Sequence, residues 1–350
     1  MTRLTVFFDT PASAATSLIV GCLPLLFRVR GAIYFISLLA KIRSVNRALS
    51  IVAGDRNNIN SPAPIFLPLT PVSYIGQQER VTDNMQADGD FDAIAHILLA
   101  ARAGKVALDD YPGVIPQSMA EAYAIQDKAI ALDGRRIGGW KVGRIAPHLV
   151  DQYGDTRLTG PIFADEIVDA SDGQVPEMPV YVPGFAAAEA EILLCFGAMD
   201  ARDYDIKSVR DVIVDVRAGL EIASSPFAAI NTHGPAVTAS DYGNNKGLVL
   251  GPRIPDWRNA DLIRMPVELA IDGVRLHQAT METMLDGPFG SALFLIRTLR
   301  KRGIAIPPGT WVSAGAITGI HEIAPGQRAD ALFDGHLRVS CAARRFGAAA

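Results

Sequence analysis

Cysteine is scarce in this chain of 350 residues, and its three cysteines are far apart. Cys22, Cys195 and Cys341 form no Cys-x-x-Cys motif, and no two histidines have the spacing of paired metal ligands. This pattern argues against a disulfide scaffold, a zinc site and an iron–sulfur site. It fits a reducing cytoplasm, which is the location that we expect.

An excess of positive charge is also missing, since the formal net charge is −4. Without a basic field, nucleic acid is not an expected partner. Nucleotide-binding loops with the spacing G-x-G-x-x-G or G-x-x-x-x-G-K-[ST] are absent as well. The glycine-rich segments 247–251 and 315–319 instead predict tight turns that bring backbone N–H groups to an anionic substrate. Gly315 and Thr318 are therefore candidate substrate-binding residues.

Long uninterrupted apolar runs are missing too. An apolar stretch over residues 14–40 is broken by Pro24, Arg28 and Arg30. A membrane-spanning helix needs about 20 apolar residues, and each central arginine costs about 2.5 to 3.5 kcal/mol on insertion. A cleaved signal peptide fits only loosely. We do not expect a membrane protein, and a hydrophobic helix over residues 14–40 stays an alternative.

The start of the chain does not resemble the rest. Residues 57–73 are rich in Asn, Pro and Ser. We interpret residues 1–84 as a poorly structured or spurious extension, such as one from a start codon assigned too early. The folded domain is expected over residues 85–350, which are numerous enough to bury a core without disulfides. Residues 85–138 would form its small helical N-terminal part.

Hydrophobic spacing predicts helices over residues 90–103, 118–132 and 290–302. Ser118 and Glu121 form a capping-box pattern at the start of the second helix. After residue 139 the texture changes to short β-like runs separated by Gly and Pro. These runs are residues 140–143, 160–163, 187–196, 220–223, 247–250, 267–271 and 310–314. The expected fold is α+β, with a β-rich core and few helices.

Two glutamates stand two positions apart in the apolar run 185–196. Since side chains alternate along a strand, Glu189 and Glu191 should share a face, where like charges repel unless a cation lies between them. Glu221 lies in a similar run. Three glutamates match the oxygen ligands of Mg²⁺ and leave positions for water and a chelating substrate. A strand end that emerges into water is the alternative for this pair.

Lys141 lies between glycines and apolar residues in the segment 138–143. These neighbours favour a side chain drawn inward, toward the carboxylates. Burial or a nearby metal would lower its pKa and suit it to proton transfer. A surface lysine flanked by glycines is the alternative.

Seven motifs occur in an order that resembles the 2-keto-4-pentenoate hydratase branch of the fumarylacetoacetate hydrolase superfamily. They are Gly-Trp-Lys-Val-Gly, Gly-Pro-Ile-Phe-Ala-Asp, Ala-Glu-Ala-Glu-Ile, Gly-Leu-Glu-Ile, Asn-Asn-Lys-Gly-Leu-Val-Leu-Gly, Gly-Pro-Phe-Gly-Ser-Ala-Leu and Gly-Thr-Trp-Val-Ser-Ala-Gly. The resemblance covers nearly everything from Met85 onward. It implies a mixed β-sheet roll or sandwich with a helical N-terminal part beside it. It also implies that Glu189, Glu191 and Glu221 bind Mg²⁺ or Mn²⁺, and that Lys141 is catalytic.

The chain departs from this family at Leu158. The well-known hydratases have an aspartate at this position, which works with the lysine in acid–base catalysis. Asp155 and Asp165 are nearby alternatives, and we take Asp165 as a candidate catalytic residue. Arg157 and Asn245 are candidate substrate-binding residues, because a guanidinium group suits a substrate carboxylate and Asn245 lies in a family motif.

The resemblance implies a metal-dependent carbon–oxygen lyase of aromatic-compound catabolism, which hydrates a 2-hydroxy-2,4-dienoate or 2-oxo-4-pentenoate to a 4-hydroxy-2-oxo acid. Alternatives on the same site are a decarboxylase of a 2-oxo-3-enedioate of the 4-oxalocrotonate type and another 2-keto acid hydrolase or dehydratase. A non-catalytic subunit that binds a small acid is an alternative of another class. The expected partners are a 2-keto acid substrate and further copies of the chain in a homo-oligomer. A complex with a paralogous decarboxylase or hydratase is an alternative.

Overall fold

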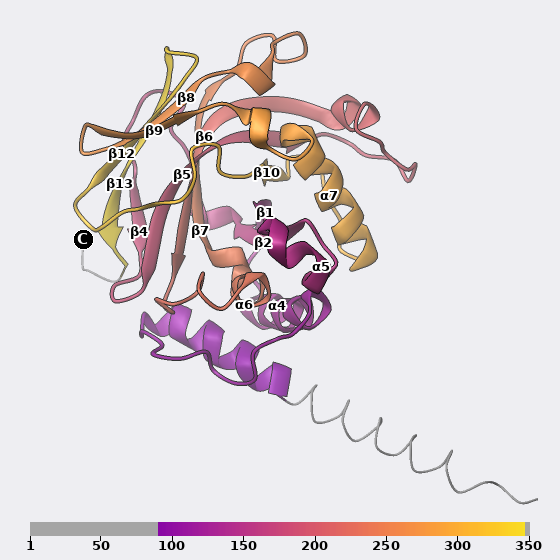
Figure 1. Ribbon diagram of the computed structural model, residues 1–350, viewed down its shortest axis with the longest axis vertical. Coiled ribbons are helices and arrows are strands. Elements are labelled where there is room, and N and C mark those ends of the chain that lie inside the picture. Colours follow the sequence, from indigo (N-terminus) through magenta and orange to yellow (C-terminus); the bar gives the residue numbers. More distant parts are fainter. Residues whose placement is uncertain (1–89, 347–350) are drawn as a thin grey trace, which may run out of the picture. The chain divides into compact units, whose positions relative to one another are not determined.

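The computed structural model describes residues 90–346 (Figure 1). Its α-helices are 90–104, α4 (Met119–Asp133), α5 (Val150–Tyr153), α6 (Pro235–Ser240) and α7 (Gly287–Lys301). Its 3-10 helices are Pro147–Leu149, Ala164–Glu166, Ser208–Val212, Tyr242–Asn244, Leu262–Arg264 and Met281–Thr283. The predicted extension over residues 1–84 and the alternative helix over 14–40 lie outside the described residues. Within the described part, no helix has the length and hydropathy that a membrane crossing requires.

The three predicted helices are all present. At the start of α4, the Ser118 side chain accepts a hydrogen bond from the backbone N–H of Glu121, as the capping pattern predicts. Gly134, with φ of 68°, ends this helix in the left-handed conformation that glycine adopts readily. Helix α7 begins three residues earlier than predicted, because Pro288 is tolerated in a first turn, where its missing N–H costs nothing.

The larger sheet has eight strands in the order β2-β1-β10-β5-β6-β7-β3, with β11 paired to β5. The strands are β1 (Ile137–Arg144), β2 (Arg157–Phe163), β3 (Ile167–Asp169), β5 (Phe185–Phe196), β6 (Ile213–Ser225), β7 (Asn245–Arg253), β10 (Trp311–Ser313) and β11 (His321–Glu322). Strand β1 is parallel to β10, and β3 is parallel to β7, while β5, β6 and β7 are antiparallel neighbours. The sheet is therefore mixed.

A second sheet has five strands in the order β4-β13-β12-β8-β9. They are β4 (Glu177–Val180), β8 (Val267–Ile271), β9 (Val274–Ala279), β12 (Arg328–Phe333) and β13 (Leu337–Arg345). Apolar residues of both sheets form one core cluster, as Leu194 of β5 and Phe333 of β12 illustrate. In Figure 1 this sheet lies on one side of β5, β6 and β7, and α5 and α7 lie on the other side. The predicted α+β class is confirmed.

Some strands are longer than predicted or are missed by the sequence pattern. The run predicted over residues 220–223 is part of β6, which begins at Ile213. Asp215 and Arg217 break the apolar pattern of this strand, but their side chains form a 3.0 Å ion pair, which lets two charges remain there. The C-terminal strands β12 and β13 are missed because polar side chains interrupt them, and Ser340 of β13 donates to Asp330 of β12 across the pair.

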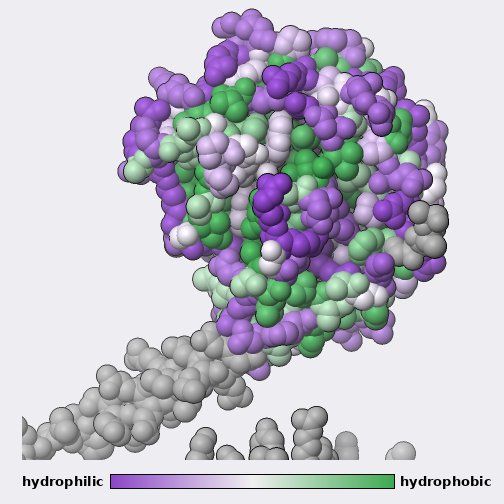
Figure 2. All heavy atoms as spheres, turned by 180° about the vertical axis from the view of Figure 1, so that it is seen from behind, coloured by the Kyte–Doolittle hydropathy of each residue, from purple (hydrophilic) through white to green (hydrophobic). Residues whose placement is uncertain are grey.

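Several large apolar side chains remain on the surface, among them Val106, Val114, Val274 and Ile320. Figure 2 shows one face of the molecule, on which hydrophobic residues gather near the middle between hydrophilic ones. Apolar surface of this kind suits an interface between protein chains. The homo-oligomer expected from the resemblance stays a prediction.

Candidate metal centre

Three buried carboxylates meet where β5 and β6 pair. Glu189 stands directly opposite Glu221 in the antiparallel register, and Glu191 follows two positions along β5. One carboxylate oxygen from each residue lies within 4.8 Å of the others. Their exposed fractions are 5%, 0% and 0% for Glu189, Glu191 and Glu221. We call these residues the glutamate triad. Because all three are buried, the alternative that Glu189 and Glu191 lie at a strand end in water is wrong.

Neighbouring groups hold the triad in place but leave part of it unpaired. Glu191 Oε2 accepts hydrogen bonds from Ser313 Oγ at 2.5 Å and from the Gly315 N–H at 2.8 Å. Glu221 Oε1 accepts from Asn245 Nδ2 at 3.0 Å. Glu191 Oε1 and Glu221 Oε2 are buried and have no hydrogen-bond partner. Because buried oxygens are almost always satisfied, this donor set fits a hard divalent cation with oxygen ligands.

Lys141 is the cation that the chain itself places against the triad. Its Nζ lies 3.0 Å from Glu221 Oε1, and the residue is 6% exposed. Burial raises the pKa of Glu189 to about 7, and burial with the charges of Glu221 and Glu189 raises the pKa of Glu191 well above its usual range. One ammonium group does not compensate three buried carboxylates.

The expected fall in the pKa of Lys141 does not occur in the protein by itself. Burial lowers this pKa, but the carboxylates outweigh burial, Glu221 first, and the pKa of Lys141 lies above its ordinary value. Lys141 is therefore an ammonium group at neutral pH. The prediction took burial and a nearby metal into account. The three carboxylates around Lys141 favour its charged form and therefore raise its pKa.

Lys141 and Glu189 line a cavity of about 470 Å³. Arg157, Leu158 and Gly315 line it as well. It is completed by Val142, Gly143, Arg144, Ile145, Ala146, Leu149, Asn231, Gly234, Pro235, Thr238, Gly243, Asn244, Thr283, Met284, Leu285, Ser291, Ala314, Ala316 and Ile320. A charged end and a largely apolar wall suit a small organic acid.

Leu158 lies beside Lys141 within this cavity. In the pairing of β1 with β2, Leu158 stands opposite Gly143, two positions along β1 from Lys141. A Cβ placed on Gly143 would lie 3.5 Å from Leu158 Cδ1 and 3.7 Å from Lys141 Cε, so these two side chains flank the same point. The neighbour of the lysine is therefore apolar here, and it cannot exchange a proton.

The structure brings most of the predicted site residues together. Asn245 contacts the triad, and Gly315, which lines the cavity, donates its N–H to Glu191. Thr318 is buried and its hydroxyl has no hydrogen-bond partner, but it does not line the cavity. Asp165 is not brought to the site, because its side chain is 62% exposed and pairs with Arg135 at 3.5 Å. Asp155 does not line the cavity either.

Sequence reasoning misses two features of the site. Ser313, which bonds Glu191, lies in the motif Gly-Thr-Trp-Val-Ser-Ala-Gly, where a polar residue in a buried strand was the available signal. Gly243 has φ of 63°, and a Cβ there would lie 2.8 Å from Lys141 Cδ. Glycine therefore leaves room for the buried lysine stem.

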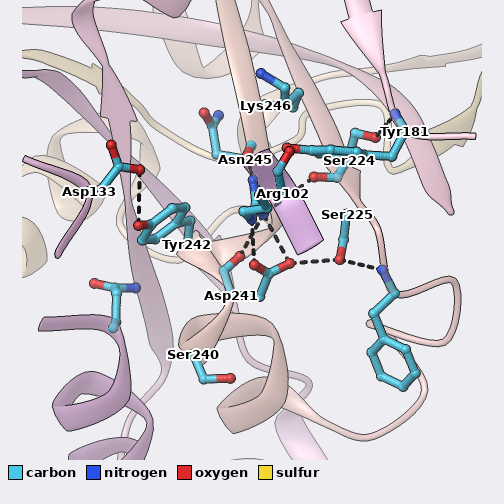
Figure 3. A network of polar contacts seen from close by, with 12 residues as sticks. Arg102, Asp133, Tyr181, Ser224, Ser225, Ser240, Asp241, Tyr242, Asn245 and Lys246 are labelled. Carbon is cyan, nitrogen blue, oxygen red and sulfur yellow. Dashed lines mark hydrogen bonds and ion pairs between the residues drawn. The ribbon is translucent and has the colours of Figure 1, made fainter. Parts of the chain in front are cut away.

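A second cluster of buried charges is centred on Arg102 and Asp241 (Figure 3). Arg102 Nε donates to Asp241 Oδ1 at 2.5 Å and its Nη2 to Asp241 Oδ2 at 3.0 Å, while Ser225 Oγ donates to Oδ2 at 2.6 Å. Arg102 Nη1 also donates to the backbone oxygen of Asn245, at 3.0 Å. We call these residues the Arg102–Asp241 cluster. It links the 90–104 helix to the strand whose asparagine bonds Glu221.

Known proteins resemble this chain in sequence. A 2-keto-4-pentenoate hydratase of Paraburkholderia xenovorans (strain LB400) is 26% identical over 211 residues, which are 59% of this chain and 77% of the relative. A 4-oxalocrotonate decarboxylase of Pseudomonas putida is 25% identical over 232 residues, 65% of this chain and 85% of the relative. No protein-family model matches the chain. The predicted resemblance to the hydratase branch is confirmed.

A solved structure resembles the fold. The 4-oxalocrotonate decarboxylase from Pseudomonas putida G7, complexed with calcium and acetate, matches with a TM-score of 0.59 and 22% identity. The match covers 73% of this chain and 97% of that chain. It supports the α+β assignment made from the strands and helices.

Proposed function

We propose that this chain is a divalent-metal-dependent lyase that acts on a small 2-keto acid or on its 2-hydroxydienoic form. The observation that carries the proposal is the glutamate triad, which has two unpaired buried oxygens and lies beside Lys141, with Glu189 and Lys141 lining a cavity. Glu189, Glu191 and Glu221 would hold Mg²⁺ or Mn²⁺, which would supply a Lewis acid for the keto and carboxylate oxygens of the substrate. The relatives support this substrate class by their names.

Lys141 is the residue that would handle protons. Its ammonium group is buried, hydrogen-bonded to Glu221 and directed into the cavity. It can stabilise negative charge that develops on the substrate, and it can donate a proton to the carbon chain. Arg157, which lines the cavity, is proposed to contact the substrate, and Asn245 is proposed to orient Glu221.

Hydration of a 2-hydroxy-2,4-dienoate is the first candidate reaction, supported by the hydratases among the relatives. Its test is turnover of 2-hydroxypenta-2,4-dienoate with and without added Mg²⁺. We expect activity only with the cation, and loss of both activity and Mg²⁺ binding when all three glutamates are changed to alanine. Mg²⁺ binding that survives the triple substitution would refute the metal assignment.

Decarboxylation of a 2-oxo-3-enedioate is the second candidate, and Leu158 favours it. Hydration moves protons to two carbons and takes one from water, so a second proton-transfer group beside Lys141 would help. Loss of CO₂ breaks one carbon–carbon bond and moves its electron pair along the conjugated chain to the keto oxygen. That step needs stabilised charge but no second acid or base.

One experiment separates the two candidates. CO₂ release from 2-oxo-3-hexenedioate and water addition to 2-hydroxypenta-2,4-dienoate are measured side by side with the Mg²⁺-loaded protein and its Leu158→Asp variant. A decarboxylase releases CO₂ faster than it hydrates, and the aspartate raises hydration only. A hydratase gives the opposite ratio in the unaltered protein. No Mg²⁺-dependent turnover of either compound would favour the non-catalytic alternative.

A further inference from the structure

Two arginines line the same cavity as Lys141 and Glu189. Arg144 of β1 and Arg157 of β2 are directly opposite each other in the strand register, and both line the cavity. Arg144 follows Lys141 by three positions on the same strand, a distance of about 10 Å at the rise of a β-strand. The proposed function gives Arg157 a contact with the substrate without naming the substrate group that it meets, and it gives Arg144 no role.

Arg157 is buried without an acid partner. It is 8% exposed, and it donates one hydrogen bond, from Nη2 to the backbone oxygen of Leu285. Among the described residues, no carboxylate oxygen lies within 4.0 Å of its guanidinium nitrogens. Arg102, Arg217 and Arg302 have side chains that are 6%, 11% and 7% exposed, and each pairs with an aspartate. Arg157 differs from these three arginines because it has no such ion pair among the described residues.

The surroundings of Arg157 also favour a bound anion. Burial lowers the pKa of Arg157, the charge of Asp286 raises it in part, and the charge of Arg144 lowers it further. Its Nη2 lies against the first turn of α7, since a Cβ placed on Gly290 would be 3.2 Å away. The N-terminus of a helix of this length attracts negative charge. Asp286, the residue before the helix, makes no capping hydrogen bond with its side chain.

We infer that Arg157, with Arg144 beside it, binds a second carboxylate of the substrate, at the end of the molecule opposite the 2-keto acid group. The inference rests on the proposed function, because the keto acid end must lie at the glutamate triad. A guanidinium group binds a carboxylate through two parallel N–H donors, and Arg157 has N–H groups left for this. The substrate class is therefore a dicarboxylic 2-keto acid.

The inference separates compounds that the triad alone would accept equally. A 2-oxo-3-enedioate has the second carboxylate, whereas 2-hydroxypenta-2,4-dienoate has none. The backbone positions of Lys141 and Arg144 are about 10 Å apart along β1, and both residues line one cavity, which leaves room for a short chain between the two ends. A monocarboxylic substrate would leave the buried charge of Arg157 uncompensated.

The test is a matched pair of non-reacting ligands. 2-Oxoadipate and 2-oxohexanoate have the same chain length and the same keto acid end, and they differ only in the distal carboxylate. Calorimetric titration of each into the Mg²⁺-loaded protein measures the difference. We expect 2-oxoadipate to bind at least about tenfold more tightly, as one charged hydrogen-bonded contact allows.

Variants locate the effect. Arg157→Gln is expected to remove the preference and to leave the affinity for 2-oxohexanoate within about twofold, while Arg157→Lys retains part of the preference because it keeps the charge. Arg275→Gln, an exposed arginine of β9, is the control and should change neither affinity. Far-UV circular dichroism and thermal unfolding of each variant show that it folds.

Each outcome decides one question. Equal Mg²⁺-dependent binding of the two ligands to the unaltered protein overturns the second carboxylate site and leaves the proposed function standing. A preference that persists in Arg157→Gln also overturns the assignment to Arg157. If neither ligand needs the cation, the proposed function fails, and the second site fails with it. If Arg157→Gln does not fold, the comparison in the unaltered protein and in Arg144→Gln decides.

Discussion

The Arg102–Asp241 cluster and the glutamate triad are both buried, but their charges are compensated differently. In the first, a guanidinium group and a carboxylate of opposite sign share two hydrogen bonds, and Ser225 supplies a third. In the second, three carboxylates face one ammonium group, and two oxygens have no partner. Burying these charges costs desolvation energy in both places. The chain completes the first cluster by itself and leaves the second open to a cation.

Asn245 connects the two clusters. Its backbone oxygen accepts from Arg102, and its side chain donates to Glu221. The Arg102–Asp241 cluster therefore fixes the position of Asn245, which orients Glu221 of the glutamate triad. This arrangement predicts that substitutions in the Arg102–Asp241 cluster lower the stability of the fold, whereas substitutions in the glutamate triad lower the metal affinity.

The largest effect is expected from Asp241→Ala, which leaves Arg102 buried and unpaired. The free energy of unfolding should fall by about 3 to 5 kcal/mol, as for a broken buried ion pair. Urea unfolding followed by circular dichroism, without metal, measures it. Asp169→Ala is the control, because its side chain is 53% exposed and its pair with Arg217 should contribute about 0 to 1 kcal/mol. Equal losses in the two variants would remove the distinction between the clusters.

Glu191→Gln tests the glutamate triad through metal affinity and stability. Mg²⁺ affinity should fall at least about 100-fold, since loss of a direct ligand costs more than loss of an outer partner. Stability without metal should stay the same or rise, because a neutral side chain removes a buried charge that burial and Glu221 disfavour. Calorimetry and urea unfolding give the two values. A large loss of stability without metal would mean that Glu191 is structural.

The pH dependence sharpens the comparison. Burial raises the pKa of Glu189 to about 7 in the folded protein, above its value near 4.5 in an unfolded chain. Its contribution to stability is therefore fully present below pH 4.5 and is lost as the pH rises to 7. Metal binding runs in the opposite direction, because the ion displaces protons from Glu189 and from Glu191, whose pKa is also raised, and Mg²⁺ affinity should fall at least about tenfold per pH unit below 7. Titrations between pH 5 and 8 measure the slope, which Glu189→Gln should flatten.

Much of the open cluster could be predicted from the sequence. Alternation along a strand places Glu189 and Glu191 on one face, and the structure has them there. The sequence could not show that Glu221 stands directly opposite Glu189, because strand register depends on contacts between distant segments. The glycines and apolar residues around Lys141 favoured a side chain drawn toward the carboxylates, the resemblance placed it in the same site, and the structure has it 3.0 Å from Glu221.

The Arg102–Asp241 cluster could not be predicted from the sequence. Arg102 and Asp241 are 139 positions apart, and neither lies in a pattern that marks a buried charge. Arg102 sits on a helix whose apolar spacing was visible, but an arginine on such a helix is expected at the surface. Contacts between distant segments also explain why the prediction for Asp165 failed. Its position near Leu158 in the sequence suggested a place in the site, but its side chain pairs with Arg135.

Asn245→Ala tests the link between the clusters. Removing the side chain takes one hydrogen bond from Glu221, so Mg²⁺ affinity should fall about tenfold, as for other residues behind metal ligands. The backbone contact with Arg102 is kept, and stability without metal should change little. Calorimetry at pH 8 measures the affinity, with the exposed Asn259→Ala as control. An unchanged affinity would show that the two clusters act independently.

The smallest effect is expected from Asp165→Asn. Its carboxylate is largely exposed, its ion pair with Arg135 is long, and Arg135 keeps closer bonds to Asp133 and Glu166. The free energy of unfolding should change by less than about 0.5 kcal/mol, as for other surface substitutions. Mg²⁺-dependent turnover should be unchanged, because Asp165 does not line the cavity. A loss of turnover with intact stability and intact Mg²⁺ binding would place a proton-transfer group outside both clusters, and Leu158 would then no longer argue against hydration.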